Sequence, residues 1–300
     1  MGRQKLTDVV RDGTVLVSDG AWGTALQARG LKPGECPELW CIEHPDEVVD
    51  VAANYIAAGA DLVETNSFGG NQFKLEYYGL AEQTTEINRA AAELSRTAAG
   101  EHHWVMASIG PTGKMLITEE VTPEELYETF RTQAEAFAAG GADAVCIETM
   151  SDMEEASLAI RAVKEHTSLE VICTFTFDRT VRGDYRTMMG LSPQAALSAA
   201  AEAGADIIGT NCGNGMERMV EIIHAMRQED ENIPLMVQAN AGLPQNVNGQ
   251  DIFPDTPEDM AKFVPDLIQS GVRIIGGCCG TTPEHIRAIK QAVMNYQAKQ

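Results

Sequence analysis

The stretch Gly204-Ala205-Asp206-Ile207-Ile208-Gly209-Thr210-Asn211-Cys212 decides the fold, because three other parts of the 300-residue chain follow the same plan. The other copies are Gly59-Ala60-Asp61 before residues 62–66, Gly141-Ala142-Asp143 before residues 144–149, and Gly271-Val272-Arg273 before residues 274–279. In each copy a helical stretch ends at a glycine, which is a common helix C-cap. A short apolar run follows and ends in polar or reactive residues. This pattern predicts four copies of a helix–strand unit.

Four further apolar runs lie between these copies, at Val15–Ser18, Trp104–Ile109, Val171–Phe175 and Leu235–Gln238. Helical patterns separate the runs, at Pro123–Ala139, Ser151–Glu165 and Pro193–Ala203. Eight strands that alternate with helices predict an α/β fold, a (β/α)₈ TIM barrel, as a single domain over residues 1–300. The apolar runs are continuous, as expected for parallel strands buried on both faces. An open doubly wound sheet is the alternative, but Gly20-Ala21-Trp22-Gly23-Thr24 does not fit its G-x-G-x-x-G turn.

The composition excludes several classes of protein. The formal net charge of −22, without clusters of Lys and Arg, argues against binding to nucleic acid or to anionic membrane surfaces. No stretch of about 18 uncharged apolar residues predicts a transmembrane helix, and the N-terminus does not resemble a signal peptide. We therefore expect a cytoplasmic protein. The seven cysteines do not suggest a disulfide framework in that compartment.

The strand ends carry the candidate functional residues, because the active site of this fold lies at the C-terminal ends of the strands. These ends bring together Asp19, Glu64-Thr65-Asn66, Glu148, Asn211-Cys212, Asn240 and Cys278-Cys279.

Cys212, Cys278 and Cys279 can supply three thiolates for a catalytic zinc ion, which keeps a fourth position open. Adjacent side chains normally point apart, so two neighbouring ligands need an irregular turn. Gly276, Gly277 and Gly280 make such a turn sterically accessible. At this point two alternatives stay open: small buried thiols, or a redox disulfide between Cys278 and Cys279.

Asp19 and Glu148 can hold the ammonium group of an amino acid, and the backbone N–H groups of Gly20, Ala21 and Thr65-Asn66-Ser67 can hold its carboxylate. A structural cap is the alternative for each carboxylate, and for Glu64 we expect a cap or a pairing with a helix residue. Asn240 offers an amide oxygen to a metal or a substrate, or is an ordinary turn residue.

The motifs together resemble the zinc-dependent homocysteine S-methyltransferases over nearly the whole chain. They are residues 18–24, 64–69, Gly110-Pro111-Thr112-Gly113, 148–152, Thr210-Asn211-Cys212-Gly213, Asn240-Ala241-Gly242 and 277–283. The segment Gly34-Glu35-Cys36-Pro37-Glu38-Leu39-Trp40 is most similar to the homocysteine-binding module of cobalamin-dependent methionine synthase.

The resemblance implies that Cys212, Cys278 and Cys279 bind Zn²⁺, that Asp19 and Glu148 contact the amino group, and that Asn240 lies near the metal. It also implies that Gly20, Ala21 and Thr65–Ser67 bind the substrate carboxylate. Two segments depart from the family pattern. Gln238-Ala239 replaces a proline-containing approach to Asn240, and residues 179–185 are unusually rich in Asp and Arg.

The expected activity is the activation of homocysteine as a thiolate and its methylation to methionine. No Asp-x-His-x-x-Gly cobalamin motif is present, and the 300 residues leave no room for a folate-binding barrel. We therefore expect methylcobalamin, carried by a separate corrinoid protein, to donate the methyl group. S-methylmethionine, S-adenosylmethionine or betaine is the second choice of donor. Two competing functions stay open: a corrinoid-linked zinc demethylase that acts on another methyl donor, and a non-catalytic zinc- or thiol-binding component of an assembly.

Overall fold

The eight principal strands form one parallel sheet that closes on itself. The computed structural model describes residues 4–247 and 250–299. Its strand order is β1-β12-β9-β8-β5-β4-β3-β2, and a parallel bridge between Ser18 and Leu62 joins the two ends. The strands are β1 (Leu16–Val17), β2 (Leu62–Glu64), β3 (Trp104–Ile109), β4 (Ala144–Met150), β5 (Glu170–Phe175), β8 (Ile207–Asn211), β9 (Leu235–Ala239) and β12 (Val272–Gly277). The predicted TIM barrel and its single domain are confirmed.

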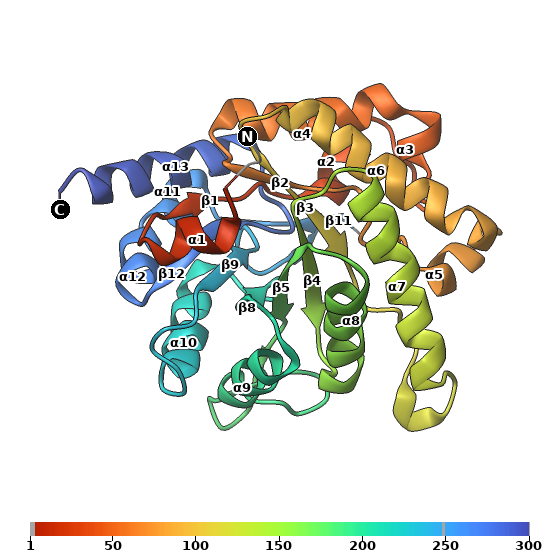
Figure 1. The fold of residues 1–300 in the computed structure, drawn as a ribbon. Coiled ribbons are helices and arrows are strands. Elements are labelled where there is room, and N and C mark those ends of the chain that lie inside the picture. The colour runs from red at the N-terminus through yellow and green to blue at the C-terminus, as the bar shows by residue number, and fades with distance from the viewer. Residues whose placement is uncertain (1–3, 248–249, 300) are drawn as a thin grey trace.

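Helices surround the strands on the outside (Figure 1). The larger ones are α4 (Pro45–Ala58), α6 (Thr84–Ala99), α7 (Pro123–Ala139), α8 (Met153–His166), α9 (Pro193–Ala203), α10 (Met216–Arg227) and α13 (Pro283–Gln297). The shorter ones are α1 (Leu6–Arg11), α2 (Trp22–Ala28), α3 (Trp40–Glu43), α5 (Gln72–Glu76), α11 (Pro257–Ala261) and α12 (Val264–Gln269). Two antiparallel hairpins extend from loops, β6 (Asp178–Arg179) with β7 (Tyr185–Arg186), and β10 (Gln245–Val247) with β11 (Gln250–Ile252).

The aspartate of the repeat has a structural function in three of the four copies. Asp206 Oδ2 accepts a hydrogen bond from the Val171 backbone N–H over 2.7 Å and pairs with Lys164 Nζ at 2.5 Å. Asp61 repeats this arrangement with the N–H of Val17 and with Lys290. Asp143 repeats it with the N–H of Val105 and with Arg96. Each aspartate thus fixes the start of its strand against the preceding strand and an outer helix.

The residues that cap the N-termini of the helices determine where these helices begin. Pro123–Ala139 and Pro193–Ala203 are helices as predicted, and each follows a capping hydroxyl, Thr122 or Ser192. The helix predicted from Ser151 begins at Met153 instead, because the Asp152 side chain accepts a hydrogen bond from the Glu154 backbone N–H. Within the described ranges, no helix has both the length and the apolar character needed to cross a bilayer.

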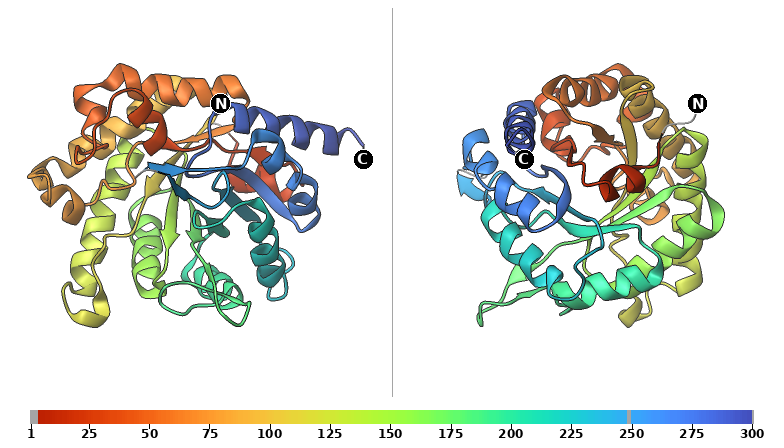
Figure 2. Two further views of the ribbon diagram at one scale, coloured as in Figure 1. Left: turned by 180° about the vertical axis from the view of Figure 1, so that it is seen from behind. Right: turned by 60° about the vertical axis from the view of Figure 1, so that its left-hand side comes forward.

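Helix α1 closes the N-terminal end of the barrel. Its Leu6 and Val10 pack in one cluster with inward-facing residues of eight strands, among them Leu16, Met106 and Cys146. Figure 2 shows α1 in red, at the centre of the ring of helices in the right-hand view. The buried Glu170 carboxylate accepts hydrogen bonds from the backbone N–H groups of Leu6 and Thr7, over 2.6 and 2.9 Å. An apolar plug therefore fills the barrel below the strand ends that carry the predicted site.

Candidate metal centre and substrate cavity

The three predicted metal ligands meet at the C-terminal end of the barrel. The Sγ atoms of Cys212, Cys278 and Cys279 all lie within 4.8 Å of one another. The Cys212–Cys279 separation is 3.8 Å and the Cys278–Cys279 separation is 4.0 Å. Two sulfurs that each lie about 2.3 Å from a tetrahedral zinc ion are about 3.8 Å apart, so the cluster has the dimensions of a zinc site. All seven cysteines are free thiols, so the structure contains no disulfide between Cys278 and Cys279.

Irregular backbone at two strand ends brings these sulfurs together. Cys212 follows β8 with φ 56°, which is uncommon for a residue with a side chain and turns its sulfur toward the cavity. Gly280 has φ 79°, and a Cβ atom at this position would meet the ring of Phe253. The turn after β12 therefore requires glycine at position 280, as the sequence predicted.

Hydrogen bonds among the sulfurs distribute the protons unevenly. The thiols of Cys278 and Cys279 donate to the Cys212 sulfur and lower its pKa to about 3. The protons stay on the two donors, so the same hydrogen bonds to the Cys212 sulfur raise the pKa of Cys279 to about 12 and that of Cys278 well above its usual value. A cation bound by the three sulfurs would release the protons that remain on them.

Asn240 lies beside the cysteines with an unsatisfied acceptor. Its side chain is 3% exposed, and its Oδ1 atom has no hydrogen-bond partner among the described residues. A hydrogen bond from the Asn240 side chain also helps to lower the pKa of Cys212. A buried amide oxygen without a donor is costly, so this atom is suited to a cation that completes the sulfur site.

Asp19 is a fully buried carboxylate with one oxygen occupied and one open. Oδ2 accepts hydrogen bonds from Trp22 Nε1 at 2.9 Å and from the Glu64 backbone N–H at 2.8 Å. Oδ1 has no partner in the described part of the chain. Burial raises the pKa of Asp19 from 3.8 to about 7. A cationic group placed against Oδ1 would satisfy this oxygen and restore the charge of the carboxylate.

Glu148 is held from both sides. Ser108 Oγ donates to its Oε1, and Asn211 Nδ2 donates to its Oε2 over 2.9 Å. Burial raises the pKa of this carboxyl to about 7. The residue after it, Thr149, has φ 61°, so β4 carries a left-handed residue one position before its end, as Cys212 does directly after β8.

One cavity of about 430 Å³ joins these groups, within the usual range of small-molecule sites, roughly 300–1,000 Å³. The predicted residues that line it are Gly20, Ala21, Thr65, Asn66, Ser67, Glu148, Cys212, Cys278 and Cys279. Asp19 and Asn240 are buried in the wall behind this lining. Two of the backbone donors expected for a substrate carboxylate are already occupied. The Ala21 N–H donates to Thr281 Oγ1, and the Ser67 N–H donates to the carbonyl of Thr65.

Glu64 is a third carboxylate of this cavity, and the role that the sequence suggested for it was wrong. Its Oε1 accepts a hydrogen bond from Gln238 Nε2 on β9 over 3.1 Å, so its partner is neither a cap nor a helix residue. Burial, together with the charges of Glu148 and Asp19, raises its pKa well above the usual value. Gln238, which departs from the family pattern, therefore binds the Glu64 carboxylate inside the barrel. The two residues meet because the sheet closes.

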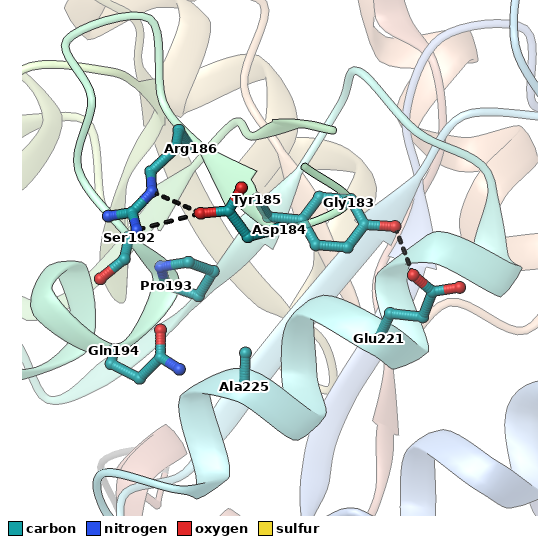
Figure 3. Close-up of a pocket in the computed structure, with 9 residues that line it drawn as sticks. All are labelled: Gly183, Asp184, Tyr185, Arg186, Ser192, Pro193, Gln194, Glu221 and Ala225. Atoms are coloured by element: carbon teal, nitrogen blue, oxygen red, sulfur yellow. Dashed lines mark hydrogen bonds and ion pairs between the residues drawn. The ribbon is translucent and has the colours of Figure 1, made fainter. Parts of the chain in front are cut away.

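The Asp- and Arg-rich segment 179–185 lies outside the cavity. It forms the β6–β7 hairpin, which borders a separate cavity of about 320 Å³ against α9 and α10 (Figure 3). There Tyr185 donates to Glu221 at 2.7 Å, and Arg186 pairs with Asp184 at 3.0 Å. Each charged group drawn there thus already has a partner, and we assign no ligand to this second cavity.

Comparison with known proteins points to one family. The family described as homocysteine S-methyltransferase matches residues 16–293. Methionine synthase from Mycobacterium tuberculosis is 32% identical over 304 residues, which cover 94% of this chain and 25% of that protein. Methionine synthase from Mycobacterium leprae is 32% identical over 302 residues, 93% of this chain and 24% of that protein. The chain thus spans about a quarter of the length of these relatives.

Among solved structures, the metallated form of the homocysteine methyltransferase MmuM from Escherichia coli superposes with a TM-score of 0.76 at 25% identity. The match covers 92% of this chain and 96% of MmuM. The family match over almost the whole barrel, together with the cysteine cluster at the strand ends, means that this chain belongs to the homocysteine S-methyltransferase family.

Proposed function

We propose that this protein is a zinc-dependent methyltransferase that converts homocysteine to methionine. The observation that carries the proposal is the single cavity lined by Cys212, Cys278, Cys279 and Glu148, with Asp19 directly behind its wall. A thiol-binding end and an ammonium-binding end in one cavity suit a short amino acid with a terminal sulfur. A purely structural zinc site would normally be filled by four protein ligands, which disfavours the non-catalytic alternative.

Each end of the cavity has a distinct task. Zn²⁺ held by the three sulfurs would deprotonate the substrate thiol at neutral pH, and the thiolate ligands would keep it electron-rich. Asp19 Oδ1 and Glu148 would hold the substrate ammonium group, which satisfies the unpartnered Oδ1 atom. With the ammonium and sulfur both fixed, the thiolate is oriented for in-line attack on a methyl group, and this positioning supplies much of the catalysis.

The substrate carboxylate is left with fewer donors than the sequence suggested. Gly20, Thr65 and Asn66 line the cavity and remain our candidates for it. Ala21 and Ser67 would have to exchange their present acceptors to take part.

We propose that the methyl group arrives on methylcobalamin carried by a separate corrinoid protein. The distribution of apolar side chains supports this donor. Within the described residues, every exposed large apolar side chain except Met294 lies in a stretch of chain that follows the C-terminal end of a barrel strand and precedes α4, α6, α7, α9 or α11. These side chains, which we call the apolar rim, are Ile42, Phe68, Tyr77, Tyr78, Met115, Ile117, Val181, Met188, Met189, Leu243 and Ile252. A protein that carries the donor would have apolar side chains to contact on these connections, which a small donor such as S-methylmethionine or betaine does not need.

A donor screen tests the proposal. Methionine formation from homocysteine is measured with methylcobalamin, S-methylmethionine, S-adenosylmethionine and betaine, for the wild type and for Cys279→Ala. We expect transfer from methylcobalamin and loss of zinc and activity in the variant. Full activity of Cys279→Ala without bound metal would disprove the proposal. Proton release on titration with homocysteine separates this function from that of a demethylase, because thiol coordination expels a proton.

The seven free thiols also support a reducing, cytoplasmic location.

A further inference from the structure

Asn211, the last residue of β8, connects the two ends of the cavity. It is fully buried and directly precedes the metal-ligand candidate Cys212. Its amide makes four hydrogen bonds, all to residues of β4 and β5. Oδ1 accepts from the Thr149 backbone N–H at 2.8 Å and from Thr174 Oγ1 at 2.9 Å. Nδ2 donates to Glu148 Oε2 at 2.9 Å and to Thr149 Oγ1 at 2.8 Å.

The pattern of donors and acceptors requires an amide at this position. A carboxyamide offers two donors and an acceptor with two lone pairs, and Asn211 uses all four. An aspartate of the same shape would keep the two bonds that Oδ1 accepts but would place a carboxylate oxygen against Glu148. A leucine would leave the Glu148 oxygen and the Thr149 N–H without a partner. If position 211 only had to fill space in the core, an apolar side chain would be enough. The hydrogen bonds of Asn211 therefore indicate that it orients Glu148.

The backbone adds a second connection. Thr149 has φ 61° and Cys212 has φ 56°, so the residues that follow Glu148 and Asn211 are both held in an uncommon conformation. The Asn211 side chain links these two positions, because it bonds to the backbone and side chain of Thr149 in β4 while Cys212 is the next residue along its own chain. The carboxylate end and the sulfur end of the cavity are thereby fixed relative to each other.

We propose that Asn211 is a positioning residue that aims Glu148 at the substrate ammonium group and sets its distance from the sulfur cluster. This inference rests on the proposed binding of an amino-acid thiol, and it deepens that proposal by naming the residue that couples the two subsites. Asn211 acts through Glu148, so it selects for substrates that carry the amino group.

The variant Asn211→Asp tests this role with two substrates. Homocysteine carries the ammonium group, whereas 4-mercaptobutanoate has the same thiol and carboxylate without it. A hydrogen bond to a charged group corresponds to about a 10- to 100-fold change in affinity. We therefore expect Asn211→Asp to weaken homocysteine binding at least about 10-fold and to leave 4-mercaptobutanoate within about 3-fold, at unchanged zinc content. Calorimetric titration of the zinc-loaded protein measures both without a methyl donor.

Thr174→Val is the matched control. It removes one hydrogen bond to Asn211 Oδ1 and preserves the bond to Glu148, so the ratio of the two affinities should not change. Equal losses for both thiols in Asn211→Asp, with zinc retained, would show a purely structural residue and would overturn the proposal.

A double variant distinguishes the loss of the contact with Glu148 from a general loss of folding. In the Glu148→Gln background, the amide at position 148 can donate to a carboxylate at position 211. Asn211→Asp should then cost much less thermal stability than it does in the wild type. Equal costs in both backgrounds would mean that Asn211 does not act through Glu148. If the wild type binds homocysteine but transfers no methyl group from any donor, the proposed function fails while this inference stands on the binding data.

Discussion

Ala241 donates its backbone N–H to the carbonyl oxygen of Cys279 over 3.0 Å. One residue earlier, the Cys278 N–H donates to the carbonyl of Ala239 over 2.7 Å. Asn240 lies between these two contacts, so both cysteines that follow β12 are fixed beside it. Its unpartnered Oδ1 is therefore held at the metal-ligand cluster by backbone hydrogen bonds on either side.

Asn240→Ala should weaken zinc binding about 10- to 100-fold when homocysteine is absent, which is the range found for residues that support a metal site. Saturating homocysteine should remove most of the difference, because the substrate sulfur then supplies the fourth ligand. Competition with a chelator measures both affinities. Asn54→Ala, which changes an exposed asparagine on α4, is the control. A zinc affinity that is unchanged without homocysteine would exclude a metal-facing role.

Cys279→Ala should abolish stoichiometric zinc binding and reduce methionine formation by more than about 100-fold, since a ligand loss is at least as costly as a supporting one. Cys173→Ala is the matched control, because Cys173 is fully buried in the core on β5 and lies outside the cavity lining. This control should retain one zinc ion per chain and lose only stability. Metal analysis after gel filtration gives the result. Loss of zinc in both variants would instead indicate general unfolding.

The stability of the metal-free protein should depend on pH through Asp19. Burial raises its pKa from 3.8 to about 7, so between these pH values the folded chain binds more protons than the unfolded chain. The free energy of unfolding should therefore fall as pH rises through this window. Burial has the same consequence for Glu148, whose pKa is also about 7.

An ammonium ligand should reverse this penalty, because it favours the charged carboxylates. We expect homoserine, which has no thiol, to raise the Tm more at about pH 8 than at about pH 5.5. Asp19→Asn should flatten both dependences in differential scanning fluorimetry. A homoserine shift that is larger at the lower pH would contradict the assignment of this subsite.

Glu170→Gln should destabilise the fold by about 1–3 kcal/mol, because the buried carboxylate accepts bonds from the first turn of α1 at both oxygens. An amide would place a donor against one of these N–H groups. Urea unfolding measures the loss, and Glu165→Gln on the exposed end of α8 provides the control. The KM for homocysteine should not change, since α1 lies at the opposite end of the barrel. A change in KM without a change in stability would refute the structural role of α1.

The repeat in the sequence was sufficient to predict the fold and the meeting of the three cysteines. Parallel strands must align their C-terminal ends, so Cys212 and Cys278-Cys279 had to lie on the same end of the barrel once the strands were identified. The same reasoning placed Asp19 and Glu148 there. These positions follow from the topology of the barrel. The alternation of apolar runs with glycine-capped helices in the sequence predicts that topology.

Contacts across the barrel were not predictable in the same way. The pairing of Glu64 with Gln238 joins β2 to β9, which are 174 residues apart. The position of Asn211 in the sequence was recognised, but not its four hydrogen bonds. Nor did the sequence reveal that the Ala21 N–H is occupied by Thr281. Such details depend on side-chain rotamers and on the register between strands, neither of which leaves a local pattern.

The apolar plug of α1 has a kinetic consequence for the proposed reaction. Since Leu6 and Val10 fill the barrel from below, substrate and product reach the cavity from the C-terminal ends of the strands. A donor protein docked on the apolar rim would cover these ends, so homocysteine has to enter before the donor arrives. Methionine can then depart only after the donor has withdrawn. Such a donor protein would therefore impose an ordered, sequential scheme, with the donor as the last reactant to bind and the first to leave.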